Sequence, residues 1–511
     1  MQAQVQEHVG QEVRHARVLV IGSGFAGLAM AIRLCSEGLT RPEDLLVLER
    51  AAEVGGTWRD NTYPGAACDV PSQLYSFSFA PNPRWSRSFS FQPEIQRYLR
   101  AVADDSGVRA QILFSHPVTG ARFDEQQARW YVDTDRGAFS AQFLVTAVGA
   151  LSDPRVPDLP GLADFGGDVF HSARWDHDLD LTGRRVAVVG TGASAIQFVP
   201  RIAPKVSHLT LFQRTPPWVL PRTDRALTAA EHWAYSRSPR LQRLAREGVY
   251  WARETYAYGF TRNPRLLTVA ERIARAHLRH QVADPALRAR LTPTYRIGCK
   301  RILISNDYYP ALTRPDVDVV ASGVARLEPG VVVAADGGRH EADTLIFGTG
   351  FQVTDMPMAH WLRGRGGRTL ADAWAETGTR AHLGATVDGF PNLFLLVGPN
   401  TGLGHSSQVF MIEQQVAYVA AAMAEADRRG AATVEVRAQA VDASDAEVQQ
   451  RMARTIWATG GCDSWYLDAS GRNTTLWPDF TFRYRQRLAR FDAESFTFGR
   501  VTAALPVGVP A

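Results

Sequence analysis

The chain has 511 residues, of which 45% are hydrophobic and 21% charged, and its formal net charge is only +4. This length predicts two or three domains, and the composition is typical of a folded globular protein. The near balance of charge gives no indication of a nucleic-acid partner. No run of 18 or more apolar residues occurs and the first residues are polar, so we expect neither a membrane span nor a signal peptide.

The four cysteines, Cys35, Cys68, Cys299 and Cys462, are scattered along the chain. They have neither the C-x-x-C arrangement nor the spacing of a zinc site, so we expect no metal centre. So few cysteines in so long a chain favour a reducing compartment. We therefore expect a cytoplasmic protein.

A glycine-rich loop follows the first apolar run of the chain. Residues 17–21 (RVLVI) predict a strand buried on both faces of a parallel sheet. The motif Gly22-x-Gly24-x-x-Gly27 comes next, then a helical stretch, and a second apolar run ends at Glu49. This order predicts a βαβ unit that holds a dinucleotide pyrophosphate at the start of its helix, with Glu49 accepting hydrogen bonds from the ribose.

The same pattern returns at residues 185–189 (RVAVV), which lead into Gly190-x-Gly192 with alanine at the third glycine position. Here the second strand ends at Arg214 and Thr215 instead of an acid. A carboxylate would repel a 2′-phosphate, whereas a guanidinium and a hydroxyl would bind one. The second nucleotide is therefore expected to be NADP(H), unless Arg214 is only a solvated residue at the edge of the sheet.

Three further features carry candidate chemistry with alternatives left open. Trp58, after a glycine pair, suits either the face of a flat cofactor ring or an ordinary core position. Asp69 lies in an apolar neighbourhood and needs a cationic partner if it is buried. Lys300 and Arg301 are adjacent, so on an extended segment they point in opposite directions, one towards the NADP phosphate and one towards the other cofactor. A basic surface strand is the alternative.

The string Phe165-x-Gly167-x-x-x-His171-x-x-x-Trp175-Asp176 lies between the two units. It resembles the fingerprint of the type I Baeyer–Villiger monooxygenases and matches it at every fixed position. Read without the resemblance, His171 is more readily a structural hydrogen-bonding residue than a general base. The segments GGTW, YPGAACDV, FQRTPPW and the one containing Lys300 and Arg301 agree with the same family, so the resemblance covers nearly the whole chain.

The resemblance implies an enzyme that uses FAD, NADPH and O₂ to convert a small ketone into an ester or lactone through a C4a-peroxyflavin. Arg301 matches the catalytic arginine of the family, and Asp69 matches the carboxylate that orients it. Trp465 matches a tryptophan near the nicotinamide ribose, although the following GRNTTLWP departs from the family pattern. The cofactor-binding positions implied are Gly22, Gly24, Gly27, Glu49, Thr57, Trp58 and Asp69 for FAD, and Gly190, Gly192, Arg214, Thr215, Lys300 and Trp465 for NADP.

We therefore predict an α/β fold with two Rossmann-like dinucleotide-binding domains, each three-layered, and a helical insertion in the NADP domain. The expected boundaries are 1–150 and 380–511 for the FAD-binding domain, 151–222 and 297–379 for the NADP-binding domain, and 223–296 for the Arg-rich helical insertion. We expect a monomer or a weak homo-oligomer.

Three other functions share part of this pattern. A heteroatom-oxidising flavin monooxygenase is the nearest alternative, and Trp175 argues against it. A pyridine-nucleotide–disulfide reductase needs a redox cysteine pair near the flavin, and Cys35 and Cys68 lack the usual close spacing. A non-enzymatic redox sensor would use the two loops without needing Arg301.

Overall fold

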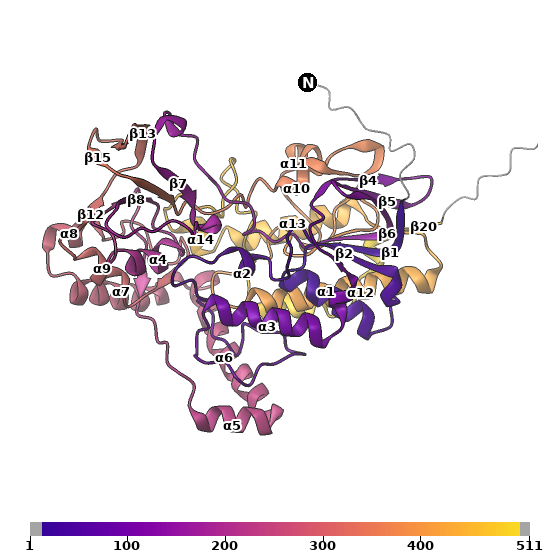
Figure 1. The fold of residues 1–511 in the computed structure, drawn as a ribbon. Helices are drawn as coiled ribbons and strands as arrows, with labels where there is room; N and C mark the ends of the chain where they lie inside the picture. Colours follow the sequence, from indigo (N-terminus) through magenta and orange to yellow (C-terminus); the bar gives the residue numbers. More distant parts are fainter. Residues whose placement is uncertain (1–12, 501–511) are drawn as a thin grey trace, which may run out of the picture.

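The computed structural model describes residues 13–500, so the first part of the polar N-terminal segment lies outside it. The two large sheets occupy opposite sides of the molecule in Figure 1, and the helices α5 (Ala229–Arg237) and α6 (Pro239–Thr261) extend from its lower edge. The predicted α/β architecture with two Rossmann-like units is confirmed. No helix among the described residues is long and apolar enough to cross a membrane.

The first sheet has the strand order β17-β4-β5-β6-β1-β2-β3, with β18 also paired to β6. Its central strands pair in parallel, whereas β4, β5 and β6 form an antiparallel meander. The strands are β1 (Arg14–Ile21), β2 (Leu45–Leu48), β3 (Ile112–Leu113), β4 (Val118–Asp124), β5 (Arg129–Thr134), β6 (Gly137–Thr146), β17 (Leu362–Arg363) and β18 (Leu393–Leu395).

Strand β1 is buried on both faces, as its apolar run predicts. Val18 and Val20 belong to the core under the helices, while Leu19 and Ile21 belong to the core on the opposite face. Successive side chains of a strand point to opposite faces, so a strand covered on both sides must be apolar at every position. The helices that supply these two cores are α1 (Phe25–Ser36), α3 (Gln92–Asp105), α12 (Gln408–Arg429) and α15 (Thr481–Leu488) on one face, and α10 (Pro357–Trp361) and α11 (Leu370–Thr377) on the other.

The second sheet has the order β12-β9-β8-β16-β7, and all its pairs are parallel. Helices cover one face and a small antiparallel sheet covers the other, which gives three layers. Its elements are β7 (Asp168–His171), β8 (Arg185–Val189), α4 (Ala195–Ile202), β9 (His208–Phe212), α9 (Tyr308–Leu312), β12 (Val317–Val320) and β16 (Thr344–Phe347), with β13 (Val324–Glu328), β14 (Val331–Ala334) and β15 (Arg339–Glu341) as the covering sheet.

The predicted insertion is helical and is bracketed by a short parallel pair, β10 (Val219–Leu220) and β11 (Leu303–Ile304). A capping box between Thr228 and Glu231 starts its first helix. Its helices are α5 (Ala229–Arg237), α6 (Pro239–Thr261), α7 (Leu267–Gln281) and α8 (Pro285–Arg290). Further elements are α2 (Thr57–Asp60), α13 (Ala438–Met452), α14 (Ile456–Thr459) and the antiparallel pair of β19 (Thr433–Val436) with β20 (Phe496–Gly499).

Two features differ from the sequence-based expectations. We expected the chain to return to the FAD-binding domain at residue 380. It returns earlier, since β17 already pairs with β4 of the first sheet, and Leu362 is buried there. Cys299 and Cys462, 163 residues apart, form a disulfide, while Cys35 and Cys68 remain free. A disulfide is uncommon in a reducing compartment, so this pair does not follow from the cysteine argument.

Candidate active site

The first glycine loop has the geometry of a pyrophosphate cradle. Gly22 has φ +100°, and a Cβ there would lie 2.6 Å from the Ala147 carbonyl oxygen. A Cβ on Gly27 would lie 1.9 Å from the Gly22 oxygen, so this glycine lets α1 pack against β1. Gly24 instead faces only Gly56, at 3.7 Å, and no side chain caps the helix start. The free N–H groups of α1 therefore suit the pyrophosphate of FAD.

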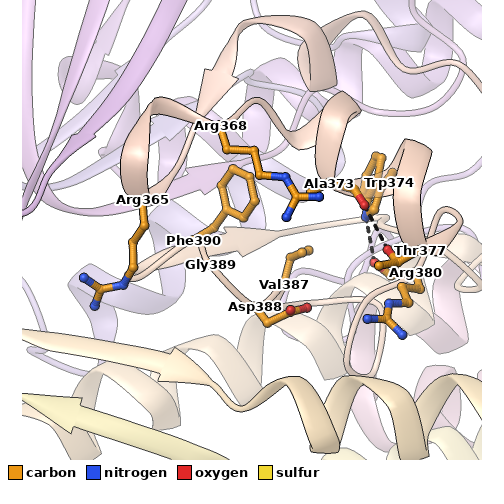
Figure 2. Close-up of a pocket in the computed structure, with 10 residues that line it drawn as sticks. All are labelled: Arg365, Arg368, Ala373, Trp374, Thr377, Arg380, Val387, Asp388, Gly389 and Phe390. Carbon is orange, nitrogen blue, oxygen red and sulfur yellow. Dashed lines mark hydrogen bonds between the residues drawn. The ribbon is translucent and has the colours of Figure 1, made fainter.

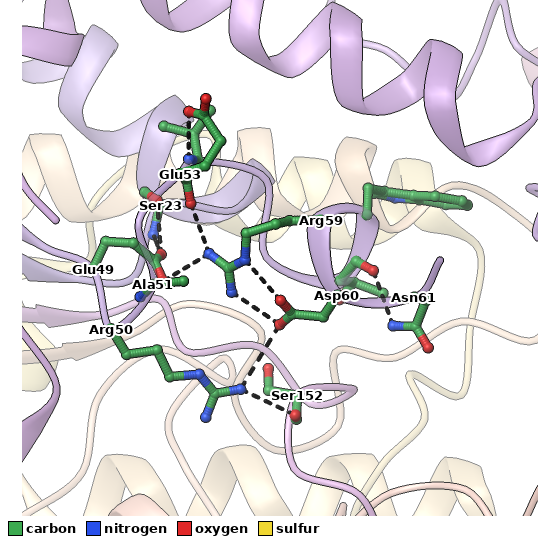
Figure 3. Close-up of polar contacts among 12 residues, drawn as sticks. Ser23, Glu49, Arg50, Ala51, Glu53, Arg59, Asp60, Asn61 and Ser152 are labelled. Carbon is green, nitrogen blue, oxygen red and sulfur yellow. Dashed lines mark hydrogen bonds and ion pairs between the residues drawn. The ribbon is translucent and has the colours of Figure 1, made fainter. Parts of the chain in front are cut away.

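Glu49 lies at the end of β2 and is buried, but protein donors already surround its carboxylate (Figure 3). One oxygen accepts hydrogen bonds from the backbone N–H and hydroxyl of Ser23, at 2.9 and 2.7 Å. The other accepts from the Ala51 N–H at 2.9 Å and from Arg59 at 2.8 Å. A ribose that binds Glu49 must therefore replace Arg59 or the Ser23 hydroxyl. The sequence reasoning missed Arg59.

Thr57 and Trp58 open the short helix α2 next to this network. The Trp58 indole N–H donates to the Tyr75 hydroxyl at 2.9 Å, and its half-buried ring packs against the helical core. The Thr57 hydroxyl lies 3.5 Å from the Leu151 carbonyl oxygen, at the limit of a hydrogen bond. Trp58 thus combines core packing with a partly open face.

The second glycine loop repeats the construction of the first. Gly190 has φ +107°, and a Cβ there would lie 2.5 Å from the Gly348 carbonyl oxygen. A Cβ on Gly192 would meet no atom closer than 3.9 Å, so the loop leaves its backbone accessible. Helix α4 begins at Ala195, and the side chain of its N-cap Ser194 makes no capping hydrogen bond. The Ile196 and Gln197 N–H groups already donate to the Gly192 and Ser194 carbonyl oxygens, so the accessible loop backbone before α4 is the part that suits a second pyrophosphate.

Two cations lie near one another beside this loop. Arg214 is exposed at the end of β9, and Lys300 is half-buried with its ammonium 5.3 Å from the Tyr295 ring centroid. Burial lowers the pKa of Lys300, repulsion by Arg214 lowers it further, and Asp463 opposes both. Neither cation forms an ion pair within residues 13–500, and the Thr215 backbone is tied to the loop through the Thr191 hydroxyl. Two unpaired cations at this position suit a 2′-phosphate.

Asp69 and Arg301 form a bidentate ion pair that joins segments 232 residues apart. Arg301 Nε donates to one carboxylate oxygen at 2.8 Å and Nη2 donates to the other at 2.7 Å. Arg253 of α6 adds a hydrogen bond to the Asp69 carbonyl oxygen at 3.0 Å. One third of the Arg301 side chain remains open to solvent, so the pair leaves part of its guanidinium available. The sequence reasoning missed Arg253.

The pair keeps both partners charged. Asp69 raises the pKa of Arg301 above its usual value, against the effect of burial. Burial by itself would raise the pKa of Asp69, but Arg301 and then Arg253 more than offset this and lower it. The guanidinium is therefore a permanent, oriented cation at the junction of the two nucleotide units.

The fingerprint residues do not converge on this pair. Phe165 is buried under the small antiparallel sheet, and a Cβ on Gly167 would lie 2.4 Å from the Asp343 carbonyl oxygen. Trp175 packs against α4, and the Asp176 carboxylate accepts two backbone N–H groups of the following turn. These contacts place Phe165 and Trp175 in the cores on the two faces of the second sheet.

His171 ends β7, where it pairs with Phe347 of β16. Its Nδ1 accepts the Ala173 backbone N–H at 3.1 Å. Burial lowers the pKa of His171 to about 4, so the ring is neutral near pH 7 and a weak base. These contacts favour the structural role over the catalytic one.

Trp465 lies in the segment after the disulfide and is 43% exposed. Its ring centroid is 4.4 Å from that of Tyr466, which is buried. Trp465 is thus available at the surface of the segment, whereas Tyr466 faces inward.

A separate cavity of about 210 Å³ lies beside α11, and none of the predicted site residues lines it (Figure 2). Its three arginines are neutralised by ion pairs: Arg365 with Glu125 and Glu435, Arg368 with Glu376, and Arg380 with Asp442. It therefore offers no free charge to an anionic ligand. No cluster of potential metal ligands occurs in the part of the chain that the structure describes.

Comparisons with known proteins agree with this site. Residues 19–250 match the family model described as pyridine nucleotide-disulphide oxidoreductase. The disulfide of this chain lies outside that range, so the match concerns the nucleotide-binding units. Among solved structures, an oxidized steroid monooxygenase bound to NADP is 34% identical, with a TM-score of 0.82 over 95% of this chain and 100% of that one. The complex of OTEMO with FAD and NADP is 27% identical, with a TM-score of 0.84 over 96% and 100%.

Two named relatives are more similar in sequence than these structures. A Baeyer–Villiger monooxygenase of Streptomyces coelicolor is 54% identical over 94% of this chain and 92% of its own length. One of Pseudomonas aeruginosa is 47% identical over 94% of this chain and 91% of its own length. The similarity extends over both domains and the insertion. This chain belongs to the Baeyer–Villiger monooxygenase family.

Proposed function

We propose that this protein is an FAD- and NADPH-dependent monooxygenase that uses O₂ to convert ketones into esters or lactones. The observation that carries the proposal is the Asp69–Arg301 ion pair, which follows directly on the segment where Ala67 is hydrogen-bonded to Gln197 of α4. Proteins of similar sequence bear the name of this reaction, and similar structures hold FAD and NADP.

The free N–H groups at the start of α1 would hold the FAD pyrophosphate, and the open backbone of the loop from Gly190 to α4 would hold that of NADP. When bound, FAD reduced by NADPH supplies the chemistry that activates O₂. Arg214 and Lys300 would select the 2′-phosphate, and Trp465 would lie on the ribose side of the coenzyme. Glu49 would hold the FAD ribose once one of its present donors moves aside.

Arg301 would stabilise the negative charge that forms on the substrate oxygen. Attack on a ketone carbon places negative charge on the carbonyl oxygen, and a preorganised cation lowers the energy of that charge. A guanidinium remains charged and offers several donors in one plane, so it can hold Asp69 and the reacting oxygen together. Asp69 fixes the direction of the guanidinium and keeps it ionised.

The finer assignments are also proposals. We propose a small ketone as substrate, a cytoplasmic location, and a monomer or weak homo-oligomer. The aromatic residues of the chain suit apolar ketones, but they do not distinguish cyclic, aliphatic and aromatic ones.

The experiment measures NADPH oxidation, ester formation and hydrogen peroxide with a panel of ketones and one thioether. We expect a yellow protein whose NADPH consumption rises with at least one ketone and yields its ester. Arg301→Ala should keep FAD and NADPH binding, yet its ester formation should fall about 10²–10³-fold or more. Arg326→Ala, on the exposed strand β13, is the matched control.

Ester formation at the normal rate by Arg301→Ala would remove Arg301 from the reaction. If the wild-type protein oxidises only the thioether, the heteroatom-oxidising alternative holds instead.

A further inference from the structure

Tyr466 combines deep burial with an unused hydroxyl. Its residue surface is only 1% exposed, and it belongs to a cluster at the base of the insertion that also contains Ile297, Cys299, Trp457 and Leu476. Its phenolic oxygen has no hydrogen-bond partner among residues 13–500. A buried polar group without a partner costs about 1–3 kcal/mol, so such a group calls for an explanation.

Tyr466 packs in one cluster with Ile297 and Cys299, which directly precede Lys300 and Arg301 in the chain. Its phenol also interacts electrostatically with both Arg301 and Asp69, more strongly with Arg301. Its protonation state is fixed, because burial raises the pKa of Tyr466 to about 12, although Arg301 opposes the rise. Near pH 7 the hydroxyl is thus a neutral hydrogen-bond donor.

The chain holds Tyr466 in this place through two connections. The Thr475 hydroxyl donates to the Tyr466 carbonyl oxygen at 3.3 Å, and the Tyr466 N–H donates to the Ser464 hydroxyl at 3.3 Å. The disulfide from Cys462 to Cys299 ties this segment to the one that carries Arg301 two residues later. The phenol and the guanidinium therefore belong to one covalently linked unit.

We propose that the Tyr466 hydroxyl is a second donor to the oxygen anion that Arg301 stabilises, so that a neutral and a cationic donor meet at the substrate carbonyl. This inference rests on the proposed function and adds a catalytic residue to it. A ketone oxygen that gains negative charge is stabilised better by two preorganised donors than by one. The substrate oxygen would then accept the hydrogen bond for which the Tyr466 hydroxyl has no acceptor in the protein.

The alternative is that Tyr466 is only a core residue. Tyr308 supplies the comparison, because its hydroxyl is also buried and without a partner among the described residues. It lies in the core of the second sheet and packs near Tyr309, away from the ion pair. An effect that comes merely from removing an unpaired phenolic oxygen should therefore occur at both positions.

The test compares Tyr466→Phe with Tyr308→Phe in the full-length, FAD-loaded protein. Anaerobic reduction of the flavin by NADPH and FAD content should stay unchanged in both, and Tm should not fall in either, since neither hydroxyl makes a protein hydrogen bond. With a ketone that the wild type converts, Tyr466→Phe should lose about 10²-fold in kcat for ester formation, and hydrogen peroxide should replace the missing ester. Tyr308→Phe should keep both the rate and the ester-to-peroxide ratio.

Equal ester rates and equal coupling in Tyr466→Phe and the wild type would overturn the inference. A lowered Tm with loss of FAD in Tyr466→Phe would also overturn it, because the hydroxyl would then be structural. If the wild type forms no ester from any ketone, the proposed function fails first, and the two failures are thus distinguished.

Discussion

Arg301 shows how one partly buried ion pair fixes both charge and direction. Asp69 engages the guanidinium with two parallel hydrogen bonds, which a lysine ammonium could not reproduce. Because Arg301 and Arg253 lower the pKa of Asp69, the pair is complete above the usual pKa of an aspartate. Its contribution to stability is lost only as the pH falls through that lowered value. Near neutral pH the site therefore has a single charge state.

Residue-scale reasoning from the sequence was partly successful. The rule that a buried carboxylate needs a cation indicated a partner for Asp69, and the structure brings Arg301 to it. The same rule gave no partner for Glu49, because Arg59 reaches it only through the turn of α2. The depth of Tyr466 depends on packing among four distant segments, which no local pattern shows.

The unpaired cations Arg214 and Lys300 lead to a prediction about coenzyme choice. Each charged hydrogen bond to a phosphate contributes about 1.5–3 kcal/mol, so Arg214→Ala or Lys300→Ala should raise KM for NADPH about tenfold to hundredfold. KM for NADH, which has no 2′-phosphate, should change little. Steady-state kinetics with both coenzymes measures the ratio, and Lys205→Ala on an exposed turn of the same domain is the control. An equal rise for NADH would contradict the assignment.

At the scale of elements, the strongly patterned segments were predicted and the long-range ones were not. The apolar run before the first loop gave β1, and the run at residues 185–189 before the second loop gave β8. The early return of β17 to the first sheet was missed, since a two-residue strand is specified by its partner β4 and not by its own sequence. The same limitation hid the Cys299–Cys462 pair, whose members are 163 residues apart.

That disulfide anchors the segment that carries Trp465 and Tyr466, and its removal gives a second prediction. A cross-link over so long a loop typically stabilises by about 2–4 kcal/mol, so Cys462→Ser should lower Tm measurably. Dithiothreitol should lower the wild-type Tm to the same value and leave the variant unaffected. Cys35→Ser, at a free cysteine, should behave as wild type in both conditions. A wild-type Tm insensitive to the reductant would contradict the role given to this pair.

At the scale of the whole molecule, the two sheets are separate units connected through the insertion. Glu254 of α6 is buried and accepts hydrogen bonds from the Thr481 N–H and hydroxyl at 2.9 and 2.7 Å. His405 lies 3.3 Å from the same carboxylate, so the insertion is fastened to the first domain. The sequence predicted the insertion but not these contacts of Glu254, because His405 and Thr481 lie more than 150 residues from it in the chain. Each sheet nevertheless keeps its own core and its own glycine loop.

This separation predicts that the two cofactors can be lost one at a time. In Gly27→Ala the new methyl group would meet the Gly22 oxygen, whereas in Gly190→Ala it would meet the Gly348 oxygen at 2.5 Å, with φ +107° adding strain. Gly27→Ala should therefore purify without FAD and colourless. Gly190→Ala should remain yellow but lose NADPH-dependent flavin reduction, while dithionite still reduces its flavin. Gly183→Ala, strained at φ +73° but with no atom within 4 Å, controls for backbone strain alone. A colourless Gly190→Ala would show instead that the second sheet is needed to hold FAD in the first.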